Sequence, residues 1–166
     1  VDELGYDAAL FRNVNFAPTR RRGGELEAAW KVVDGLSLKA AYAYTDAYFR
    51  SGTYEGRQVP LVPHHQASIQ AIWEAGQYGT YSAITRHVGE RRYSSDFSNT
   101  HGMLAGYTTL DLQAVWQFKP WKISAKVLNA FDRKYSPQAG YAASYSDTYY
   151  YPADGRGFYV VGRYDF

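Results

Sequence analysis

The sequence predicts an all-β fold, in which about eight antiparallel strands form an up-and-down transmembrane β-barrel. Three observations predict it. Most segments alternate between apolar and polar residues, short and long connections take turns along the chain, and aromatic residues make up 17% of the 166 residues. A side-chain period of two gives a strand one apolar and one polar face. In a membrane barrel, the apolar face meets lipid and the polar face meets a wet lumen.

The composition excludes several other classes of protein. No apolar run approaches the ~18 residues that a membrane-spanning helix needs. Barrel strands are compatible with the mean hydropathy of −0.46, because only half of their residues are apolar. The basic residues are scattered except at 20–22, and a formal net charge of +2 argues against a nucleic-acid-binding domain. The absence of Cys excludes disulfides and thiolate metal sites. Because the chain begins at Val1 without Met or a signal peptide, we expect a processed or excised piece.

Alternation and turn residues divide the first half of the chain into four expected strands, 1–9, 24–32, 36–48 and 66–74. Residues 36–48 alternate most cleanly, because Leu38 and Tyr42 face one way and Lys39 faces the other. The segments on either side repeat this pattern, each with a tryptophan on its apolar face. The sequence therefore predicts one lipid-compatible face on each of these strands.

The second half of the chain gives four more expected strands, 78–94, 107–118, 122–135 and 156–166. Residues 107–118 again alternate clearly, whereas the residues of 78–94 do not fix which side chains face lipid. In 122–135 the alternation blurs at Leu128-Asn129, where we expect a β-bulge.

The connections between these strands alternate in length. The expected short turns are Asp34-Gly35, Ala75-Gly76-Gln77 and the turn at Pro120. The expected long loops are 10–22, 50–63, 95–106 and 138–155. Membrane barrels have short periplasmic turns and long extracellular loops. The sequence therefore predicts that all three short turns lie on the periplasmic side.

The last strand has an alternating pattern that ends on an aromatic residue, Phe158, Val160, Gly162, Tyr164 and Phe166. Chain ends are ordinarily polar and frayed. This pattern resembles the C-terminal sorting strand of Gram-negative outer-membrane barrels, whose final aromatic residue is read by the barrel-assembly machinery. The resemblance implies that the strand ends in the periplasm, which agrees with the side assigned to the short turns.

Aromatic residues gather at both ends of the expected strands. Those beside the short turns are Trp30, Trp73, Trp116, Phe118 and Trp121. Those toward the long loops are Tyr42, Tyr44, Tyr48, Phe49, Tyr107 and Tyr135. We expect the two bands to form the two interfacial girdles of a membrane barrel. A soluble sandwich would instead concentrate its aromatic residues in the middle of its strands.

Five segments resemble motifs of the TonB-dependent receptors, in the order in which that family has them. They are Thr19–Glu27, Val59–Gln66, Val88–Tyr93 with Asn99 downstream, Val127–Tyr135, and Pro152 with Gly155–Gly157. The fourth segment departs from its motif only in having Ala130 where Leu is usual. Each motif is weak alone, but the ordered set is strong and covers essentially the whole chain.

The resemblance implies TonB-dependent active transport, at the Gram-negative outer membrane, of a scarce and bulky nutrient such as an iron-siderophore, haem or a cobalamin-like cofactor. It implies a barrel of about twenty-two strands with a plugged lumen, in which residues 1–166 would form the C-terminal third. No segment resembles the plug domain or a TonB box. The implied partners are outer-membrane lipid, the barrel-assembly machinery, the remaining strands and plug of the same receptor and, through the plug, the TonB complex.

Candidate ligand contacts lie in the expected extracellular loops, at Tyr141, Tyr145, Tyr149, Tyr150, Tyr151, His101 and Arg57. Clustered loop tyrosines offer a large contact area at a small entropic cost, and packing within the loop is the alternative interpretation. Adjacent residues of a strand face opposite ways, so His64 and His65 cannot easily share a metal ion. The sequence has no catalytic motif and no metal or phosphate-binding motif, so we do not expect an enzyme, a metal site or a resident cofactor.

Charged residues fall into two groups. One group has the lumen-facing parity of its strands and is expected to form a wet wall against the plug, at Glu25, Glu27, Lys39, Asp111, Lys122, Lys126, Arg163 and Asp165. The other group, Arg20–Arg22, is expected in an extracellular loop or at its rim. There it either attracts anionic ligands or lipopolysaccharide phosphates, or forms a solvated loop base, which is the interpretation we favour.

Two other functions are compatible with the pattern. A complete eight-stranded outer-membrane barrel with a structural or adhesive role would suit 166 residues. A soluble ligand-binding β-barrel would fold in plain buffer, without detergent. Several hundred residues upstream, including a plug, would exclude the small barrel, whereas a signal peptide immediately before Val1 would exclude the receptor fragment.

Overall fold

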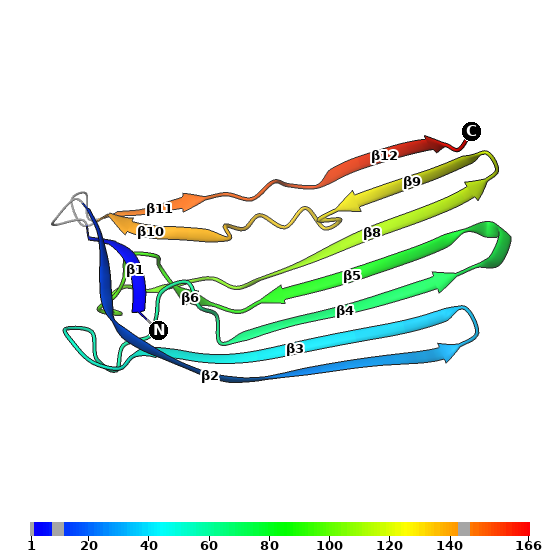
Figure 1. The fold of residues 1–166 in the computed structure, drawn as a ribbon. Coiled ribbons are helices and arrows are strands. Elements are labelled where there is room, and N and C mark those ends of the chain that lie inside the picture. Colours follow the sequence, from blue (N-terminus) through cyan, green and yellow to red (C-terminus); the bar gives the residue numbers. More distant parts are fainter. Residues whose placement is uncertain (1, 8–11, 143–146) are drawn as a thin grey trace.

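The computed structural model describes residues 2–7, 12–142 and 147–166, which form one large antiparallel sheet with long loops at one end (Figure 1). The sheet has eight strands in the order β1-β2-β3-β4-β5-β8-β9-β12. Their bounds are β1 Asp2–Asp7, β2 Arg12–Val33, β3 Leu36–Phe49, β4 His65–Glu74, β5 Thr80–Val88, β8 Tyr107–Phe118, β9 Trp121–Leu128 and β12 Gly157–Tyr164. This is the predicted up-and-down arrangement.

Short elements occupy the connections. The β4–β5 turn contains a single 3-10 turn, Gly76–Tyr78. The long connections hold two small sheets, in which β6 (Arg91–Arg92) pairs with β7 (Met103–Leu104), and β10 (Gln138–Ala142) pairs with β11 (Asp147–Tyr151). Within the residues described, no helix is long and apolar enough to cross a membrane.

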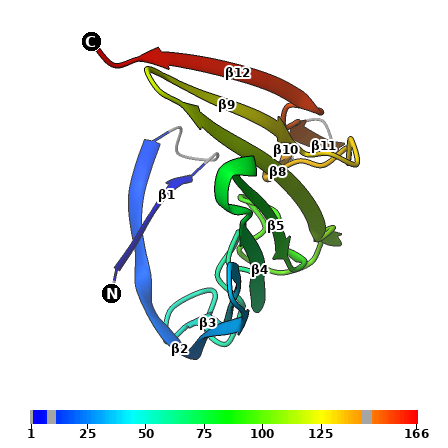
Figure 2. The same cartoon turned by 90° about the vertical axis from the view of Figure 1, so that its right-hand side faces the viewer.

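The large sheet is curved and open. Figure 2 shows the strands arranged along an arc, with β12 at one end and β1 and β2 at the other. In the described part of the chain β1 and β12 are not paired with each other, so each is an edge strand of the sheet. Curvature of this kind is what closes a larger sheet into a barrel.

The register collects the apolar side chains on the outer face of the sheet. Residues that pair across antiparallel strands lie on the same face. Leu38 pairs with both Trp30 and Ala71, so one apolar face continues from β2 to β4. The exposed fractions of Trp30, Ile69 and Val160 are 65%, 59% and 76%. This face is thus unpartnered in the chain itself, as expected of a face that meets lipid.

The buried core lies at the long-loop end of the sheet, where β3 ends, and not beneath the long strands. One cluster contains Ala47, Phe49 and Val59, and a second contains Tyr93, Leu104 and Ala139. These residues are the only buried hydrophobic ones in the part of the chain that the structure describes. The long strands therefore lack the packed interior that a soluble sandwich would need.

Several predictions are confirmed. Strands occur where 36–48, 66–74, 107–118 and 156–166 predicted them, and residues 2–7 form the expected additional strand. The Asp34-Gly35 turn is present, and Gly35 has a φ of +80°, which favours glycine. Four aromatic residues predicted beside the short turns, here called the lower girdle, are exposed: Trp30, Trp73, Phe118 and Trp121. The fifth, Trp116, is half-buried and donates to the Tyr81 hydroxyl at 3.2 Å. In the upper band, Tyr42 and Tyr44 are exposed on the outer face as predicted.

The long loop predicted at 10–22 is wrong. Residues from Arg12 onward belong to β2, which is 22 residues long and continues the sheet by pairing with β1 and with the end of β3. Arg20, Arg21 and Arg22 consequently lie in a strand, paired with Tyr48, Ala47 and Asp46. The three consecutive arginines put charge on both faces of the strand, so the apolar alternation that locates membrane strands is interrupted at 20–22.

The single strand predicted at 78–94 is also wrong. It divides into the 3-10 turn, β5 and β6. The register fixes the phase that the sequence left open, with Tyr81, Ala83 and Thr85 on the outer face. Polar residues on this outer face and apolar ones such as Ile84 on the inner face explain the ambiguous pattern.

Three further expectations are corrected near the loops. β9 ends at Leu128 instead of continuing to 135, because the chain turns where Asn129 and Asp132 adopt positive φ of 48° and 51°. Part of the loop predicted at 138–155 is the β10–β11 hairpin. In the upper girdle, Phe49 is buried in the first core cluster, and Tyr107 shares the inner face with Val88.

Gly79 is expected to be indispensable to the β4–β5 turn. It has a φ of +102°, and a Cβ atom there would lie 2.5 Å from the Val115 carbonyl oxygen. We expect Gly79→Ala to lower the free energy of unfolding by about 1–3 kcal/mol, whereas Gly24→Ala, where a Cβ meets nothing within 4 Å, should change it little. Urea unfolding of the full-length protein in lipid vesicles measures both. Equal effects would contradict the expectation.

Candidate functional site

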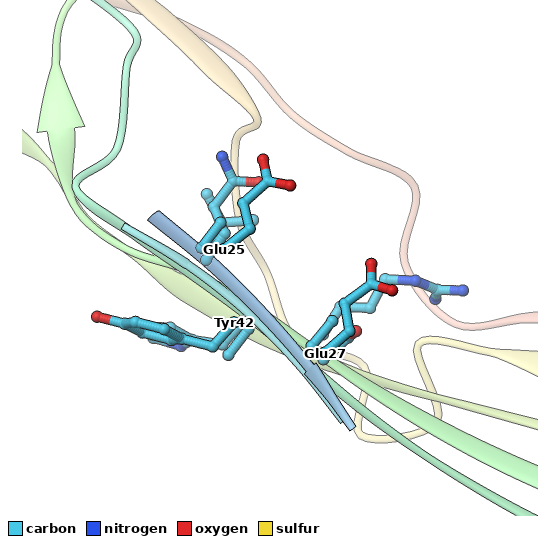
Figure 3. A pocket seen from close by; sticks show the side chains of 11 residues that line it. Glu25, Glu27 and Tyr42 are labelled. Atoms are coloured by element: carbon cyan, nitrogen blue, oxygen red, sulfur yellow. The ribbon is translucent and has the colours of Figure 1, made fainter. Parts of the chain in front are cut away.

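The inner face of the sheet carries a charged wall. Glu25 and Glu27 project from β2 toward the concave side, while Tyr42 projects from β3 to the opposite side (Figure 3). The two glutamates line a shallow cavity of ≈ 290 Å³ together with Arg86. Arg86 forms an ion pair with Asp111. Within the described residues neither glutamate has an ion-pair partner of its own, so this wall can accept a basic group from outside the chain.

Arg91 anchors the loops at the long-loop end of the sheet. Its side chain is buried, and its guanidinium donates to the backbone oxygens of Ser136 and Pro137, and to that of Gly89 at 3.3 Å. The guanidinium also lies 5.5 Å from the centre of the Tyr107 ring. Burial lowers the pKa of Arg91 below its usual value. This one side chain therefore joins the β5–β8 connection to the segment that leads into the tyrosine-rich hairpin.

Asp96 organises the β5–β8 connection from within. Its carboxylate is completely buried. One oxygen accepts the Thr100 N–H at 2.9 Å and contacts His101 Nδ1 at 3.1 Å, and the other accepts the His101 N–H at 3.2 Å. Buried carboxylates require such partners. The carboxylate fixes the position of His101, one of the predicted ligand contacts.

The β3–β4 and β5–β8 connections are joined to each other. Asn99 accepts the Gln58 N–H at 2.6 Å and donates to the Gln58 carbonyl at 3.1 Å. Arg92 donates to the Gln58 side chain at 3.0 Å and to the His101 carbonyl at 2.9 Å. The two connections therefore form one hydrogen-bonded unit.

The β10–β11 hairpin rests on this unit. Tyr141 stacks on His101 with ring centres 3.6 Å apart. Ser95 Oγ donates to the Tyr141 carbonyl at 2.7 Å and accepts the Tyr141 N–H at 2.9 Å. A hydrogen bond of 3.3 Å joins the hydroxyls of Tyr93 and Tyr150. This bond, with burial, raises the pKa of Tyr93 to about 12, whereas hydrogen bonds with Thr148 and then Tyr93 lower the pKa of Tyr150.

The structure brings together some of the predicted ligand contacts. Tyr149, Tyr150 and Tyr151 are exposed on β11, with exposed fractions of 42%, 52% and 55%. Tyr141 and His101 stack on each other, so one face of each ring is covered. Arg57 is exposed on a separate turn of the β3–β4 connection, and no contact with the hairpin is found for it among the described residues. Tyr145 lies outside the described residues. A role in ligand binding stays a prediction for all of them.

The other singled-out residues have clear positions. Phe158, Val160, Gly162 and Tyr164 share the outer face of β12, and Phe166 follows the strand with its ring 5.0 Å from that of Tyr164. His64 contacts the Gln58 side chain and the Thr45 carbonyl, at 2.6 and 3.0 Å, and His65 contacts the Tyr42 hydroxyl at 2.7 Å. These contacts fit a strand-entry role. Among the described residues no cluster could hold a metal ion.

Sequence reasoning missed the residues that hold the loops together, Arg91, Arg92, Tyr93, Asp96 and Asn99. Most of them fall within one of the quoted motif segments, Val88–Tyr93 with Asn99. The motif could therefore have pointed to a structural role. Nothing in the sequence singled out Asp96, whose importance follows from its complete burial.

Asp132 is expected to hold the start of β12 in a pH-dependent manner. Its carboxylate accepts the Arg156 N–H at 2.9 Å and the Lys134 ammonium at 3.2 Å, and these bonds lower its pKa. A lowered pKa stabilises the folded loop above the unfolded-state pKa, and the stabilisation is lost as pH falls through the folded-state pKa. Asp132→Asn should therefore speed amide exchange at Arg156 at neutral pH. The difference from the wild type should shrink as pH falls through the lowered pKa of Asp132 and vanish once its carboxylate is protonated. A difference that persists in the protonated protein would refute this origin.

The chain has clear relatives among characterised proteins. Residues 2–130 match the family described as TonB dependent receptor-like, beta-barrel. The chain is 29% identical over 144 residues to the metal-pseudopaline receptor of Pseudomonas aeruginosa, and 31% identical over 154 residues to the ferrioxamine receptor of Yersinia enterocolitica. These matches cover 82% and 87% of this chain, but 19% and 21% of the relatives. The chain thus spans about a fifth of the length of the curated relatives it matches.

Solved structures show the same fold. The ferric yersiniabactin uptake receptor of Yersinia pestis matches with a TM-score of 0.76 and 28% identity, over 89% of this chain and 24% of that receptor. A ferric citrate transporter matches with a TM-score of 0.74, over 97% of this chain and 26% of the transporter. At 20% identity the second likeness shows the fold alone.

Proposed function

The chain belongs to the TonB-dependent receptor β-barrel family, and on that premise we propose that it is part of the wall and the extracellular loops of a receptor that imports a metal chelate across the Gram-negative outer membrane. The observation that carries the proposal is the match of residues 2–130 to this family. The two-faced sheet supports it, because an apolar outer face and a charged inner face suit a wall between lipid and a wet lumen.

The proposed ligand is a metal–siderophore complex. The names of the relatives support this class, since they are receptors for metal-pseudopaline, ferrioxamine and ferric yersiniabactin. Within this chain we assign first contact to the exposed tyrosines of β11, which the hydrogen-bonded loops below them hold in place. Haem and cobalamin-like ligands belong to the broader prediction and have no such support.

The rest of the receptor would supply the parts of the transporter that this chain lacks. We propose that these strands form the C-terminal third of a barrel of about twenty-two strands, whose remaining strands cover the edges of β1 and β12. The unpaired Glu25 and Glu27 would face the plug, through which the TonB complex acts. The barrel-assembly machinery would read the pattern that ends at Phe166, and outer-membrane lipid would cover the outer face. The less favoured alternative is a complete small barrel with a structural or adhesive role.

Uptake by the full-length receptor tests the proposal. Cells that lack the receptor should fail to take up iron-55 from one member of a panel of ferric siderophores. The full-length gene should restore that uptake only when TonB is present. Tyr149→Ala combined with Tyr151→Ala should weaken binding, whereas Tyr78→Ala, at an exposed tyrosine beside a short turn, should not. Unchanged uptake of every chelate in cells without the receptor would overturn the proposal.

A further inference from the structure

The three consecutive arginines of β2 divide between the two faces of the sheet. Arg20 pairs with Tyr48, and Arg22 pairs with Asp46, whereas Arg21 pairs with Ala47. Alternate residues of a strand share a face. Arg20 and Arg22 therefore lie on the same face as Leu26 and Trp30, which is the outer face, and Arg21 lies on the inner face.

Their distance from the lower girdle places these two arginines at the outer-leaflet surface. Arg20 lies ten residues before Trp30 in β2. At about 3.3 Å per residue this is roughly 33 Å along the strand. A tilt of about 40° reduces it to roughly 25 Å along the membrane normal, which matches the height of the apolar band of such barrels. Arg20 thus lies where lipid headgroups begin. Arg22 lies two residues closer to Trp30, and its long side chain can reach up to the same level.

The surroundings of the arginines are polar and leave their charge available. Tyr44 lies next along the outer face of β3, and its ring centre is 5.4 Å from that of His65. Asp46 lies opposite Arg22, but no ion pair between them is found within the described residues. Both arginine side chains are exposed. A ligand inside the lumen cannot reach them, because they face away from it.

We propose that Arg20 and Arg22 bind the phosphate groups of lipopolysaccharide on the outer face of the barrel. Guanidinium groups match phosphate oxygens in a bidentate manner. Long arginine side chains can lay their stems along an apolar surface and hold their charge at headgroup level. Phosphorylated lipid is the anionic partner available at this depth and on this side of the sheet. The inference rests on the orientation of the barrel in the outer membrane, with its long loops outside the cell, which the family implies. It does not depend on transport of any chelate.

Lipid binding to the purified full-length receptor tests the site. Lipopolysaccharide added in detergent should raise the thermal unfolding midpoint and remain bound in native mass spectrometry. Arg20→Gln combined with Arg22→Gln should weaken this binding roughly 30-fold. Arg21→Gln is the matched control, because it removes a charge from the same strand on the other face, and it should leave the affinity unchanged. Arg20→Lys combined with Arg22→Lys keeps the charge but loses the bidentate geometry, so it should weaken the binding less than the glutamine pair does.

Three results would overturn the proposal. They are undiminished lipopolysaccharide affinity in the double glutamine variant, an equal loss in the Arg21 variant, and equal binding of phosphatidylglycerol or of dephosphorylated lipopolysaccharide. If the double glutamine variant does not fold, the single variants Arg20→Gln and Arg22→Gln decide, since undiminished affinity in both folded variants would also refute the site. None of these measurements involves a siderophore, so their failure is separate from a failure of the proposed transport.

Discussion

Ala83→Arg is expected to destabilise the inserted protein by about 2–4 kcal/mol, which is the cost of a lipid-facing arginine near the bilayer midplane. Ala83 lies close to the middle of β5 and pairs with Ala71 and Leu112 on the outer face. Ser82, its neighbour in the chain, pairs with Ile72 and Gln113 on the inner face. Ser82→Arg should cost less than about 1 kcal/mol, because the lumen wall is wet and already charged.

The comparison isolates the direction of the side chain. Both variants add the same residue, one position apart, to the same strand. The free energy of unfolding of the full-length receptor in lipid vesicles, measured by urea titration, should fall only for Ala83→Arg. Equal losses, or a larger loss for Ser82→Arg, would mean that the assigned faces of β5 are reversed or that the strand does not cross the bilayer.

Arg91→Met is expected to release the β10–β11 hairpin from the loops beneath it. The substitution keeps much of the side-chain volume but removes the donors to the carbonyls of Ser136, Pro137 and Gly89. Hydrogen bonds from a charged group contribute about 1.5–3 kcal/mol, and buried acceptors without a partner add a penalty of similar size. The local stability of the hairpin should therefore fall by about 2–4 kcal/mol.

Hydrogen–deuterium exchange of the full-length receptor measures this release. In Arg91→Met, exchange should accelerate across the β10–β11 hairpin and remain unchanged in β3, in β4 and in the part of β8 beyond Tyr107. Arg133→Met is the control, because Arg133 is exposed and its side chain forms no hydrogen bond or ion pair with the described residues. Faster exchange in the control alone, or unchanged exchange at 138–151 in Arg91→Met, would contradict the assigned role.

The membrane-spanning part of the fold could be predicted because its physics is local. Within β3 and β8, apolar and polar residues alternate over the full width of the bilayer, and the predicted bounds agree with the structure to within a residue. The same alternation correctly placed Glu25 and Lys39 on the inner face and Leu38 on the outer face. In these strands, whether a side chain meets lipid or the lumen follows from whether its position along the strand is odd or even.

The remaining parts of the fold depend on pairing that no local pattern records. The first half of β2 contains Pro18 and the three consecutive arginines 20–22, so it resembles a loop until its pairing with β1 and β3 is known. In β5, Ile84 lies on the inner face and His87 on the outer face, where His87 is satisfied by a contact of 2.9 Å with the Thr108 hydroxyl. The phase of this strand is set by its neighbours and not by its own residues.

The candidate site was predictable only in part for the same reason. Tyrosine clustering drew attention to the hairpin, and Tyr149–Tyr151 are indeed exposed there. The groups that hold the hairpin come from far along the chain, such as the contact of Arg91 with Pro137. The burial of Asp96 depends equally on the folded loop around it. Burial of this kind depends on how the loops assemble, and no periodic pattern in the sequence predicts it.

The central claim is that one face of this sheet meets lipid while the other meets a water-filled lumen, and β5 offers its most direct test. Spin labels placed one at a time at positions 82–87 of the full-length receptor in a lipid bilayer report collisions with oxygen and with a water-soluble nickel complex. Labels at 83, 85 and 87 should favour oxygen, and labels at 82, 84 and 86 should favour nickel. Accessibility that does not alternate, or that alternates in the opposite phase, would contradict the account.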